Sequence, residues 1–390
     1  MNIGVDIRCL MSPVRTGVGE YTYQLLNAVF AFDKTNQYFL FYNSSKDVSQ
    51  SIPKWEQENV HYVGLKWPNK LLNLLLFLKF VKLENLVVEK LFENCKLKIE
   101  NLNVWFSPNL NFTSLRKHTK HILTIHDLSF EFMPECLTWK QRLWHWFLRP
   151  KKQCERADII LTPSENTKRD VIDSYLPAVQ AQALQAGKVV SSKVVSSKVV
   201  KVGHGCGMQN AECRMQNGDK YILYVGTLEP RKNVDALIEA YKKLCTLAHL
   251  HTCKLIIAGD RGWKSEPVIR LIENTPGVQY IGYVDEAKKV ELYRNASLFV
   301  FPSLYEGFGL PVLEAMSAGV PVITSNRSSL PEVCGDAVYY VNPNNVLELA
   351  EAMKLVLTDE KLRQNMIQKG LERAKVFSWD DSAKVLLSLF

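Results

Sequence analysis

The sequence predicts an α/β protein with two doubly wound parallel sheets, one in each half of the chain. Short runs rich in β-branched and aromatic residues alternate with amphipathic helical stretches along all 390 residues, a pattern typical of parallel α/β architecture. Two such series follow one another, and the seam between them lies within residues 178–219. The length suits about two or three domains.

Each half carries its own set of expected strands. In the first half they are Asn2–Ile7, Tyr38–Tyr42, Val60–Val63, Asn103–Phe106, His121–Ile125 and Asp158–Leu161. In the second half they are Lys220–Val225, Lys254–Ala258, Val278–Ile281, Ser297–Phe301, Val320–Ile323 and Ala337–Val341. Helices are expected between them, for example at Asn233–Leu247, Glu286–Asn295 and Val346–Leu357.

Composition and charge exclude several classes of protein. Apolar residues make up 47% of the chain and charged residues 23%, which is ordinary for a globular protein. There is no apolar run of about 18 residues to span a membrane, and the N-terminus lacks the layout of a signal peptide. None of the nine cysteines stands in a C-x-x-C pair, so we expect free thiols, no metal site and a cytoplasmic protein.

The net charge of +8 belongs entirely to the first half. Residues 1–200 hold 26 Lys and Arg against 18 Asp and Glu, whereas residues 201–390 hold 22 of each. Different partners for the two halves would explain this asymmetry. The basic residues are scattered and match no nucleic-acid-binding module, so we expect no nucleic acid partner.

The seam contains a five-residue repeat, Lys188-Val-Val-Ser-Ser followed by two further copies that begin at Lys193 and Lys198. A period of five fits neither a strand nor a helix. We interpret residues of about 178–197 as a tandem-duplication insert in a surface loop, where added length costs little free energy. The last copy, Lys198–Val202, can still serve as a strand.

The strongest chemical signal is the segment Ser303–Met316. An apolar strand leads into a loop with Gly307, Phe308 and Gly309, and Leu310-Pro311 then begins a helix. The free N–H groups of a first helical turn, together with the helix dipole, make a site for a phosphate. Proline suits that turn, and glycines let the backbone approach a ligand. Glu306 and Glu314 lie on either side, where their carboxylates can accept hydrogen bonds from sugar hydroxyls.

A second cluster, Gly226–Asn233, places Arg231 and Lys232 after another strand. Ligands bind at the carboxyl edge of such sheets, and two cations there suit a diphosphate. Asn233 is expected to cap the next helix.

The first half offers Gly17 and Gly19 before a helix, and His126 with Asp127 after a strand. The glycines fail the dinucleotide fingerprint, because Thr22 stands where the third glycine belongs. They still allow a phosphate to approach the backbone. His126 is expected at a sheet edge that faces an interdomain cleft.

These motifs together resemble those of family 4 glycosyltransferases, nucleotide-sugar enzymes with the GT-B fold. The resemblance covers Met1–Leu176 and Val199–Phe390, and the wording of its motifs is most like that of bacterial mannosyltransferases that use GDP-mannose. The motifs that carry it are Val5–Cys9 with Thr16–Gly19, His126–Phe130, Gly226–Asn233, Ala258–Trp263, Ser303–Met316 and Ser328–Val333.

The resemblance implies a role for each site residue. Glu306 contacts the donor sugar, Glu314 the ribose, and Arg231 with Lys232 the diphosphate. Gly282-Tyr283-Val284 lies where the base is held, and His126 near the donor sugar. The resemblance further implies domains at 1–200 and 201–377, with a last helix from Ser378 to Phe390 that crosses back to the first domain.

The expected reaction retains the anomeric configuration and uses no cofactor, since the nucleotide-sugar is a substrate. No two aspartates are separated by one residue, so the Asp-x-Asp motif that holds a metal in the other major glycosyltransferase fold is missing. We expect activity without metal, in the synthesis of a cell-surface polysaccharide. A protein that binds the donor but is disabled by the insert, and a different GT-B reaction such as epimerisation or phosphorolysis, stay open.

The acceptor is suggested by the basic first half. From Lys66 to Leu83 the sequence mixes leucines with lysines and Trp67, as in a helix at a membrane surface. A helix of the first domain's core is the alternative. We expect a saccharide or lipid-linked saccharide acceptor and peripheral contact with the inner face of the plasma membrane.

Overall fold

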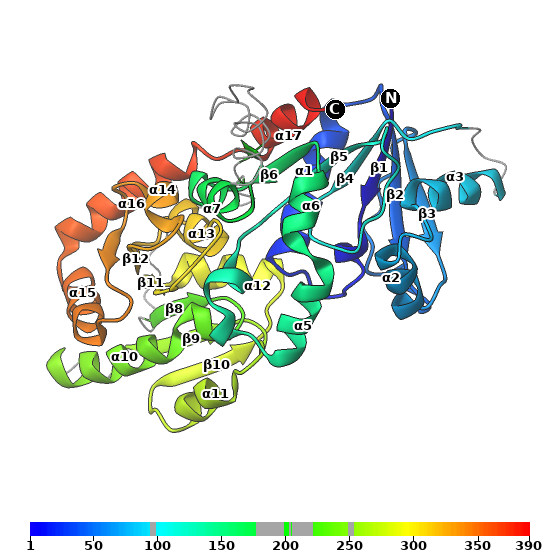
Figure 1. Cartoon of the computed structure of the whole chain (residues 1–390). Helices are drawn as coiled ribbons and strands as arrows, with labels where there is room; N and C mark the ends of the chain where they lie inside the picture. The colour runs from blue at the N-terminus through cyan, green and yellow to red at the C-terminus, as the bar shows by residue number, and fades with distance from the viewer. Residues whose placement is uncertain (94–98, 177–198, 203, 205–220, 249–252) are drawn as a thin grey trace, which may run out of the picture. The chain divides into compact units, whose positions relative to one another are not determined.

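The computed structural model describes residues 1–93, 99–176, 199–202, 204, 221–248 and 253–390. Most of the repeat insert, and the stretch 205–219 of the seam, lie outside the described residues. The chain divides into two compact units (Figure 1). Unit 1 holds Met1–Leu128, Leu143–His204 and Trp379–Phe390, and unit 2 holds Ser129–Arg142 and Gly205–Ser378.

Unit 1 is built on a parallel sheet in the order β3-β2-β1-β4-β5-β6-β7. Its strands are β1 (Asn2–Asp6), β2 (Gln37–Asn43), β3 (Val60–Leu65), β4 (Val104–Ser107), β5 (Lys120–Thr124), β6 (Ile159–Thr162) and β7 (Val199–Lys201). The last of these lies within the final copy of the repeat, as the sequence indicated. The sheet grows in one direction from β1 to β3 and then in the other from β4, which is the doubly wound topology.

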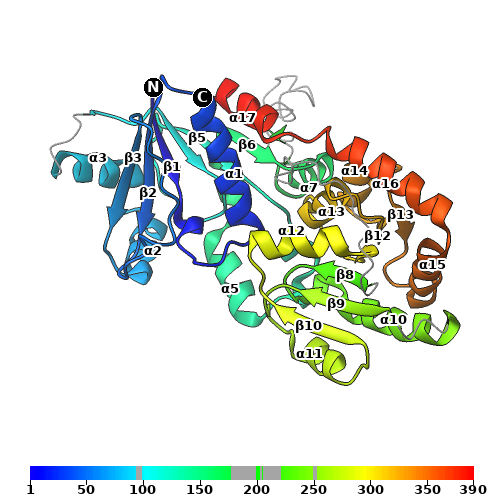
Figure 2. The ribbon, with the colours of Figure 1, turned by 180° about the vertical axis from the view of Figure 1, so that it is seen from behind.

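Helices connect these strands and cover the sheet. They are η1 (Arg8–Leu10), α1 (Gly17–Phe32), α2 (Asn69–Phe77), α3 (Leu83–Glu93), α5 (Trp139–Leu148, shared with unit 2), α6 (Pro150–Arg156), α7 (Glu165–Tyr175) and α17 (Trp379–Ser388). α17 packs against α1 (Figure 2). Ala383 and Leu386 of α17 are fully buried with Tyr21 and Leu25 of α1 in one hydrophobic cluster.

Unit 2 repeats the plan with a parallel sheet in the order β10-β9-β8-β11-β12-β13. Its strands are β8 (Tyr221–Val225), β9 (Lys254–Ala258), β10 (Val278–Gly282), β11 (Leu298–Phe301), β12 (Val322–Ser325) and β13 (Tyr339–Val341). β8 and β11 are neighbours although two strands separate them in sequence. The topological switch point of this sheet therefore lies between them.

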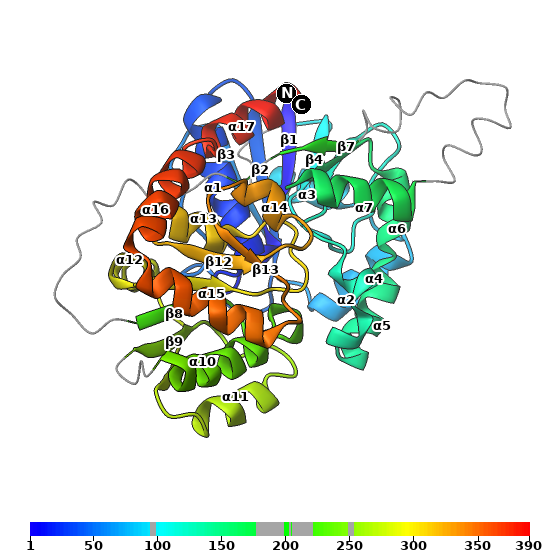
Figure 3. The same cartoon turned by 90° about the vertical axis from the view of Figure 1, so that its left-hand side faces the viewer.

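The helices of unit 2 include a bundle of late elements, in which α15 packs on α10 and α16 (Figure 3). The elements are α4 (Ser129–Phe132), η2 (Pro134–Cys136), η3 (Pro230–Lys232), α10 (Val234–Ala248), α11 (Glu266–Glu273), α12 (Glu286–Asn295), α13 (Leu310–Ser317), α14 (Leu330–Cys334), α15 (Val346–Thr358) and α16 (Glu360–Ala374). The strands are almost wholly apolar because helices bury both faces of the sheet.

One segment groups with the other half of the chain. Residues 129–142 belong to unit 2 although unit 1 flanks them in sequence. The indole Nε1 of Trp263 donates to the carbonyl of Cys136 at 2.7 Å, and Lys264 Nζ donates to the carbonyl of Glu135 at 2.6 Å. This grouping was not predicted, because the acceptors of both hydrogen bonds are backbone carbonyls, which no residue pattern reveals.

The apolar stretch of the first half forms α2 and the turn that follows. Leu72 and Leu76 are buried, whereas Leu74, Leu78 and Phe80 are exposed, Phe80 to 76%. One face of this segment is therefore part of the core of unit 1, as the alternative interpretation expected, and the other face is exposed to solvent. No helix among the described residues has the length and apolarity needed to cross a bilayer.

Candidate functional site

Two loops follow the neighbouring strands β8 and β11 and carry the predicted donor site. The first loop contains Glu229 and leads into η3 with Arg231 and Lys232, and the second runs from Pro302 to Gly309. The backbone N–H of Leu304 donates to the carbonyl of Arg231 at 2.8 Å. Because both loops leave the carboxyl ends of strands at the switch point, they occupy the place where doubly wound sheets bind ligands.

Glu306 lies at the centre of an ion-pair cluster. Lys232 Nζ lies 2.5 Å from its Oε1, and Arg231 NH1 lies 3.2 Å from its Oε2. Arg231 also pairs with Glu229 at 2.7 Å and donates to the carbonyl of Tyr305 at 2.9 Å. These four charged side chains, which we name the Glu306 cluster, are two cations and two carboxylates, all mostly buried.

Opposing effects act on the Glu306 carboxyl. Burial alone raises its pKa, but Lys232 and then Arg231 outweigh burial and lower the pKa below its usual range. The carboxylate is therefore ionised at neutral pH. It can accept hydrogen bonds from a sugar hydroxyl, as the predicted role requires.

The backbone of Glu306 is fixed by two serines that precede α14. Its N–H donates to Ser328 Oγ at 2.8 Å, and its carbonyl accepts from Ser328 Oγ and Ser329 Oγ, both at 2.9 Å. The resemblance included the Ser328–Val333 motif without a role for it. These bonds show that the two serines position Glu306.

The helix that follows begins at a glycine, as predicted. Gly309 is left-handed at φ 101°, and a Cβ built on it would lie 2.7 Å from Leu330 Cδ2. Leu310 and Pro311 then form the first turn of α13. Pro311 has no N–H, and the N–H of Val312 donates to the carbonyl of Gly309 at 3.0 Å. Within the described chain, the N–H of Leu310 is therefore the donor of this turn that can bind an anion.

Glu314, one turn further along α13, has a different environment. Its Oε1 accepts from Lys289 Nζ at 2.8 Å, and its Oε2 accepts from Tyr293 Oη at 3.0 Å. Lys289 is shared with the exposed Glu286 at 2.9 Å. We name these four residues the Glu314 cluster. It contains one cation for two carboxylates.

Burial controls the ionisation of this second cluster. It raises the pKa of Glu314, and the single shared Lys289 lowers it by less. Burial by itself would lower the pKa of Lys289, but Glu314 and Glu286 raise it, so the ammonium is retained. Glu314 thus holds its proton more readily than Glu306 does.

The other predicted donor-site residues of unit 2 differ in the exposure of their side chains. The ring of Phe308 is 4% exposed and packs edge-to-face on Phe377 at 5.5 Å, so only its backbone is left for a ligand. Tyr283 is 48% exposed after β10, whereas Val284 packs on the core of unit 2. Gly307 lies buried in the loop.

The expected cap at Asn233 is wrong. Its amide donates to the carbonyls of Pro302 at 3.2 Å and Pro343 at 2.8 Å. Its backbone is left-handed at φ 58°. The side chain therefore ties η3 to the second loop of the site, which uses the donor groups of asparagine and not the acceptor that a cap requires.

Unit 1 carries the remaining predicted residues. Gly17 is exposed with open space where a Cβ would stand, and Gly19 is buried beside the side chain of Thr16, which caps α1. His126 follows β5 and donates from Nε2 to the carbonyl of Pro108 at 2.8 Å. Tyr21 packs on its ring at 4.7 Å and on the ring of His204 at 4.8 Å.

Both histidines are kept neutral. Burial lowers the pKa of His126, and it lowers that of His204 well below the usual range, with a further decrease from His126. His204 was not singled out in the sequence. Its only signal was its place after the Lys198–Val202 strand.

Lys289 and Tyr293 were also missed. They stand four residues apart on α12 and so share one face of the helix, but many surface helices have such a pair. Only the tertiary contact with Glu314 gives them a role.

Two parallel sheets of this kind place the protein among GT-B glycosyltransferase folds. Sucrose-phosphate synthase from Thermosynechococcus elongatus superposes with a TM-score of 0.69 at 18% identity, covering 100% of this chain and 98% of that one. WaaG, a glycosyltransferase of lipopolysaccharide biosynthesis, gives a TM-score of 0.65 at 16% identity and 99% coverage of both chains. At such low identities, the likeness concerns the fold.

Sequence relatives define the family. Residues 210–373 match the model of glycosyl transferases group 1. O-antigen chain mannosyltransferase B of Escherichia coli is 30% identical over 94% of this chain and 93% of its own length. The serotype-specific mannosyltransferase WbdA of the same organism is 29% identical over 70% of this chain but only 33% of its own length. The chain belongs to this family, the family 4 glycosyltransferases.

Proposed function

We propose that this glycosyltransferase transfers mannose from GDP-mannose to a saccharide or lipid-linked saccharide during synthesis of a cell-surface polysaccharide. The names of its relatives in Escherichia coli, an O-antigen chain mannosyltransferase and a serotype-specific mannosyltransferase, support the sugar and the setting. A solved neighbour from Anabaena, described in complex with UDP and glucose, supports a nucleotide-sugar donor.

The observation that carries the proposal is the contact of Arg231 and Lys232 with Glu306. The donor diphosphate would take the two cations as counter-charges, and Glu306 would then be released toward the sugar hydroxyls. Glu314, with its higher pKa, would accept a hydrogen bond from the ribose. Tyr283 and Val284 would flank the base, and Gly17, Gly19 and His126 of unit 1 would complete the donor site.

The reaction we propose is a front-face displacement with retention of configuration. The leaving diphosphate oxygen takes the proton of the acceptor hydroxyl as the new glycosidic bond forms. Arg231, Lys232 and the first turn of α13 stabilise the negative charge that develops on the leaving group. Such preorganised electrostatic stabilisation is commonly the largest contribution to catalysis.

Release of nucleoside diphosphate from a panel of nucleotide-sugars tests this function. We expect GDP release from GDP-mannose to increase when a mannose-containing acceptor is added. Saturable donor binding without release, with or without acceptor, would identify a nucleotide-sugar-binding protein instead. A transfer preference for another donor would keep the enzyme class and change the sugar.

Metal independence is tested with a chelator. Since Arg231, Lys232 and a helix N-terminus can neutralise the diphosphate, we expect unchanged turnover in excess EDTA. Complete loss that Mg²⁺ or Mn²⁺ restores would contradict this part of the proposal. Turnover in the same buffer without EDTA serves as the reference.

A lipid-linked acceptor would bring the enzyme to the inner face of the plasma membrane. The exposed side chains of Leu74, Leu78 and Phe80 support this contact, because apolar groups beside lysines suit a membrane interface. In sedimentation with anionic vesicles at low salt, we expect binding that weakens as salt increases. A protein that ignores such vesicles would favour a soluble acceptor.

A further inference from the structure

A cavity of about 540 Å³ lies in unit 1, away from the predicted catalytic residues. Thr119 and His121 at the start of β5, and Asp158 just before β6, form part of its wall. His126 follows the other end of β5, five residues along the chain from His121, and a strand's rise of about 3.3 Å per residue separates the two by about 17 Å. The volume is typical of sites for small ligands.

Cations line this cavity with little to neutralise them. Its wall includes five cationic side chains, those of Lys79, Lys82, Arg116, Lys117 and Arg156, and Asp158 is the one carboxylate among its lining residues. Asp158 already accepts from the backbone N–H of His121 at 2.8 Å. Within the described parts of the chain, no ion pair joins any of these five cations to a carboxylate.

One of these cations, Lys79, combines an unusual backbone conformation with repulsion from its cationic neighbours. Lys79 is left-handed at φ 61°, a conformation that costs a non-glycine residue about 1 kcal/mol. Arg156 lowers the pKa of Lys79, and Lys82, Lys152 and Arg149 add to the effect. An anion bound among these groups would relieve that repulsion.

The cavity also has buried polar atoms without a partner. Among the described residues, the Oγ1 of Thr119 has no hydrogen-bond partner, and neither does Oε1 of Gln153. A buried hydroxyl without a partner destabilises the fold by roughly 1–3 kcal/mol. Thr119 contributes to the cavity wall, although its Oγ1 is itself buried beneath the surface of the cavity.

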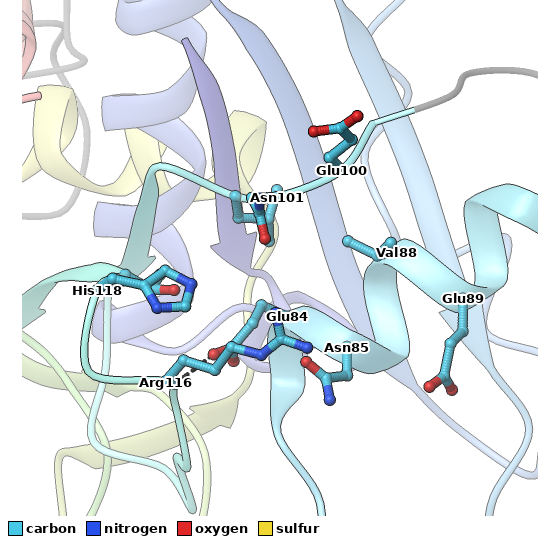
Figure 4. Close-up of a pocket in the computed structure, with 10 residues that line it drawn as sticks. Glu84, Asn85, Val88, Glu89, Glu100, Asn101, Arg116 and His118 are labelled. Carbon is cyan, nitrogen blue, oxygen red and sulfur yellow. Dashed lines mark hydrogen bonds between the residues drawn. The ribbon is translucent and has the colours of Figure 1, made fainter.

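A smaller pocket of about 140 Å³ adjoins it and has the opposite character. Glu84, Glu89 and Glu100 line that pocket, and Arg116 lies beside Glu84 (Figure 4). The backbone N–H of Arg116 donates to Glu84. Because Arg116 and Thr119 belong to both walls, the acidic residues mark the limit of the cationic cavity on this side.

On another side the cavity continues into a small groove. Lys79, Gln153 and Arg156 line both, and the groove adds the rings of Phe77 and Phe147. A ligand with an anionic group and an attached apolar chain would therefore find complementary surfaces next to one another.

We propose that this cavity binds a phosphate or diphosphate group, carried by a free anion or by a lipid headgroup. Five cations and a volume of about 540 Å³ match several anionic oxygens better than a single carboxylate. The site is separate from the donor site and does not depend on the proposed transfer reaction.

Calorimetry with inorganic pyrophosphate tests the site directly. The test variant is Lys79→Gln with Arg156→Gln, and the matched control is Lys46→Gln with Lys54→Gln, two exposed lysines of unit 1 that lie outside the cavity wall. Both lose two positive charges. We expect at least a 10-fold weaker affinity in the test variant and less than a 2-fold change in the control.

Vesicles distinguish the two sources of the group. The same proteins are sedimented with phosphatidylcholine vesicles that contain phosphatidic acid, and with phosphatidylcholine alone. If the protein binds phosphatidic acid vesicles but not pyrophosphate, and the test variant loses vesicle binding, the cavity is assigned to a lipid headgroup. Binding of pyrophosphate alone assigns it to a soluble phosphate.

Two results would overturn the proposal. One is no saturable binding of either probe by the unmodified protein, and the other is equal weakening in the test and control variants. Thermal unfolding of both variants checks that they are folded. Because the measurements record binding and not transfer, a failed proposal for the reaction leaves their outcome interpretable.

Discussion

The Glu306 cluster and the Glu314 cluster lie at either end of one loop-and-helix segment, but they treat their carboxylates in opposite ways. Two cations meet two carboxylates around Glu306, and the pKa of Glu306 is lowered. One lysine serves two carboxylates around Glu314, where burial raises the pKa. The charges nearby sum to zero in the first cluster and to −1 in the second.

This difference shows that two glutamates of one motif need not do the same chemistry. A charge-balanced group of ions can exchange partners with an incoming diphosphate and keep every charge paired. A carboxyl with a raised pKa and a tyrosine at 3.0 Å is better suited to hydrogen bonds with neutral hydroxyls. The first cluster is therefore expected to govern turnover, and the second to govern affinity for the nucleoside.

The largest expected effect concerns the cations. Lys232→Ala and Arg231→Ala should each lower kcat by at least about 100-fold, which corresponds to about 2.7 kcal/mol of lost transition-state stabilisation. Glu306→Ala should impair use of the donor. Glu314→Gln should change kcat by less than about 10-fold and act mainly on KM for the donor. Steady-state kinetics at varied donor concentration measures each effect.

Lys242→Ala provides the control, since this partly exposed lysine of α10 pairs only with Glu239 on its own helix among the ion pairs of the described chain. It should leave the kinetics unchanged. Circular dichroism of each variant separates lost chemistry from lost structure. Near-normal activity of all three Glu306-cluster variants would contradict the site assignment.

A smaller effect is expected at the glycine between the two clusters. Gly309→Ala forces a Cβ to within 2.7 Å of Leu330 Cδ2 in a left-handed conformation, which should destabilise the protein by about 1–3 kcal/mol. Gly17→Ala is the matched control at the other helix start, because nothing lies within 4 Å of its Cβ position. Its effect should stay within about 0.5 kcal/mol. Urea unfolding measures the stability of both variants. An equal loss in the two would contradict the expected contrast between the crowded Gly309 and the open Gly17.

The smallest expected effect is on the pH dependence of stability, where replacing Glu306 and replacing Glu314 should have opposite consequences. Glu306, with a lowered pKa, stabilises the fold above the unfolded-state pKa near 4.3, and this stability is lost as pH falls through the folded-state pKa. Glu306→Gln should thus lower stability at pH 7, by an amount that shrinks on acidification.

Glu314 has a raised pKa, so its ionisation opposes folding as pH rises above the unfolded-state pKa. Glu314→Gln should be as stable as the unmodified protein at pH 7, or more so, with no advantage below about pH 4. At pH 7, the free energies of unfolding of the two variants should differ by about 1.4 kcal/mol for each pKa unit that separates Glu306 from Glu314 in the unmodified protein. Urea unfolding from pH 3.5 to 8 tests this, and a loss at pH 7 of equal size in both variants would contradict the comparison.

The sequence predicted the sheets well because strand periodicity and helix capping are local. Glu286–Asn295 was predicted with the observed limits of α12, and each expected strand is present within about three residues. The loops with Arg231, Lys232 and Glu306 were predicted to lie at a sheet edge, and strand order then brings them into contact.

What the sequence could not predict depends on contacts between distant segments. Asn233 looked like a helix cap, since its alternative acceptors, Pro302 and Pro343, are 69 and 110 residues away. Phe308 looked like a donor contact, since nothing local shows that Phe377 covers its ring. Ser328 and Lys289 gained their roles in the same way.

The packing of α17 on α1 has a consequence for how the protein is made. The hydrophobic cluster that contains Tyr21 and Leu25 also needs Ala383 and Leu386. When all seven strands of the first sheet have been synthesised, the residues of α17 that complete this cluster have therefore not yet been made. Unit 1 reaches its native packing only after unit 2 has been translated, although domains generally fold in the order of their synthesis.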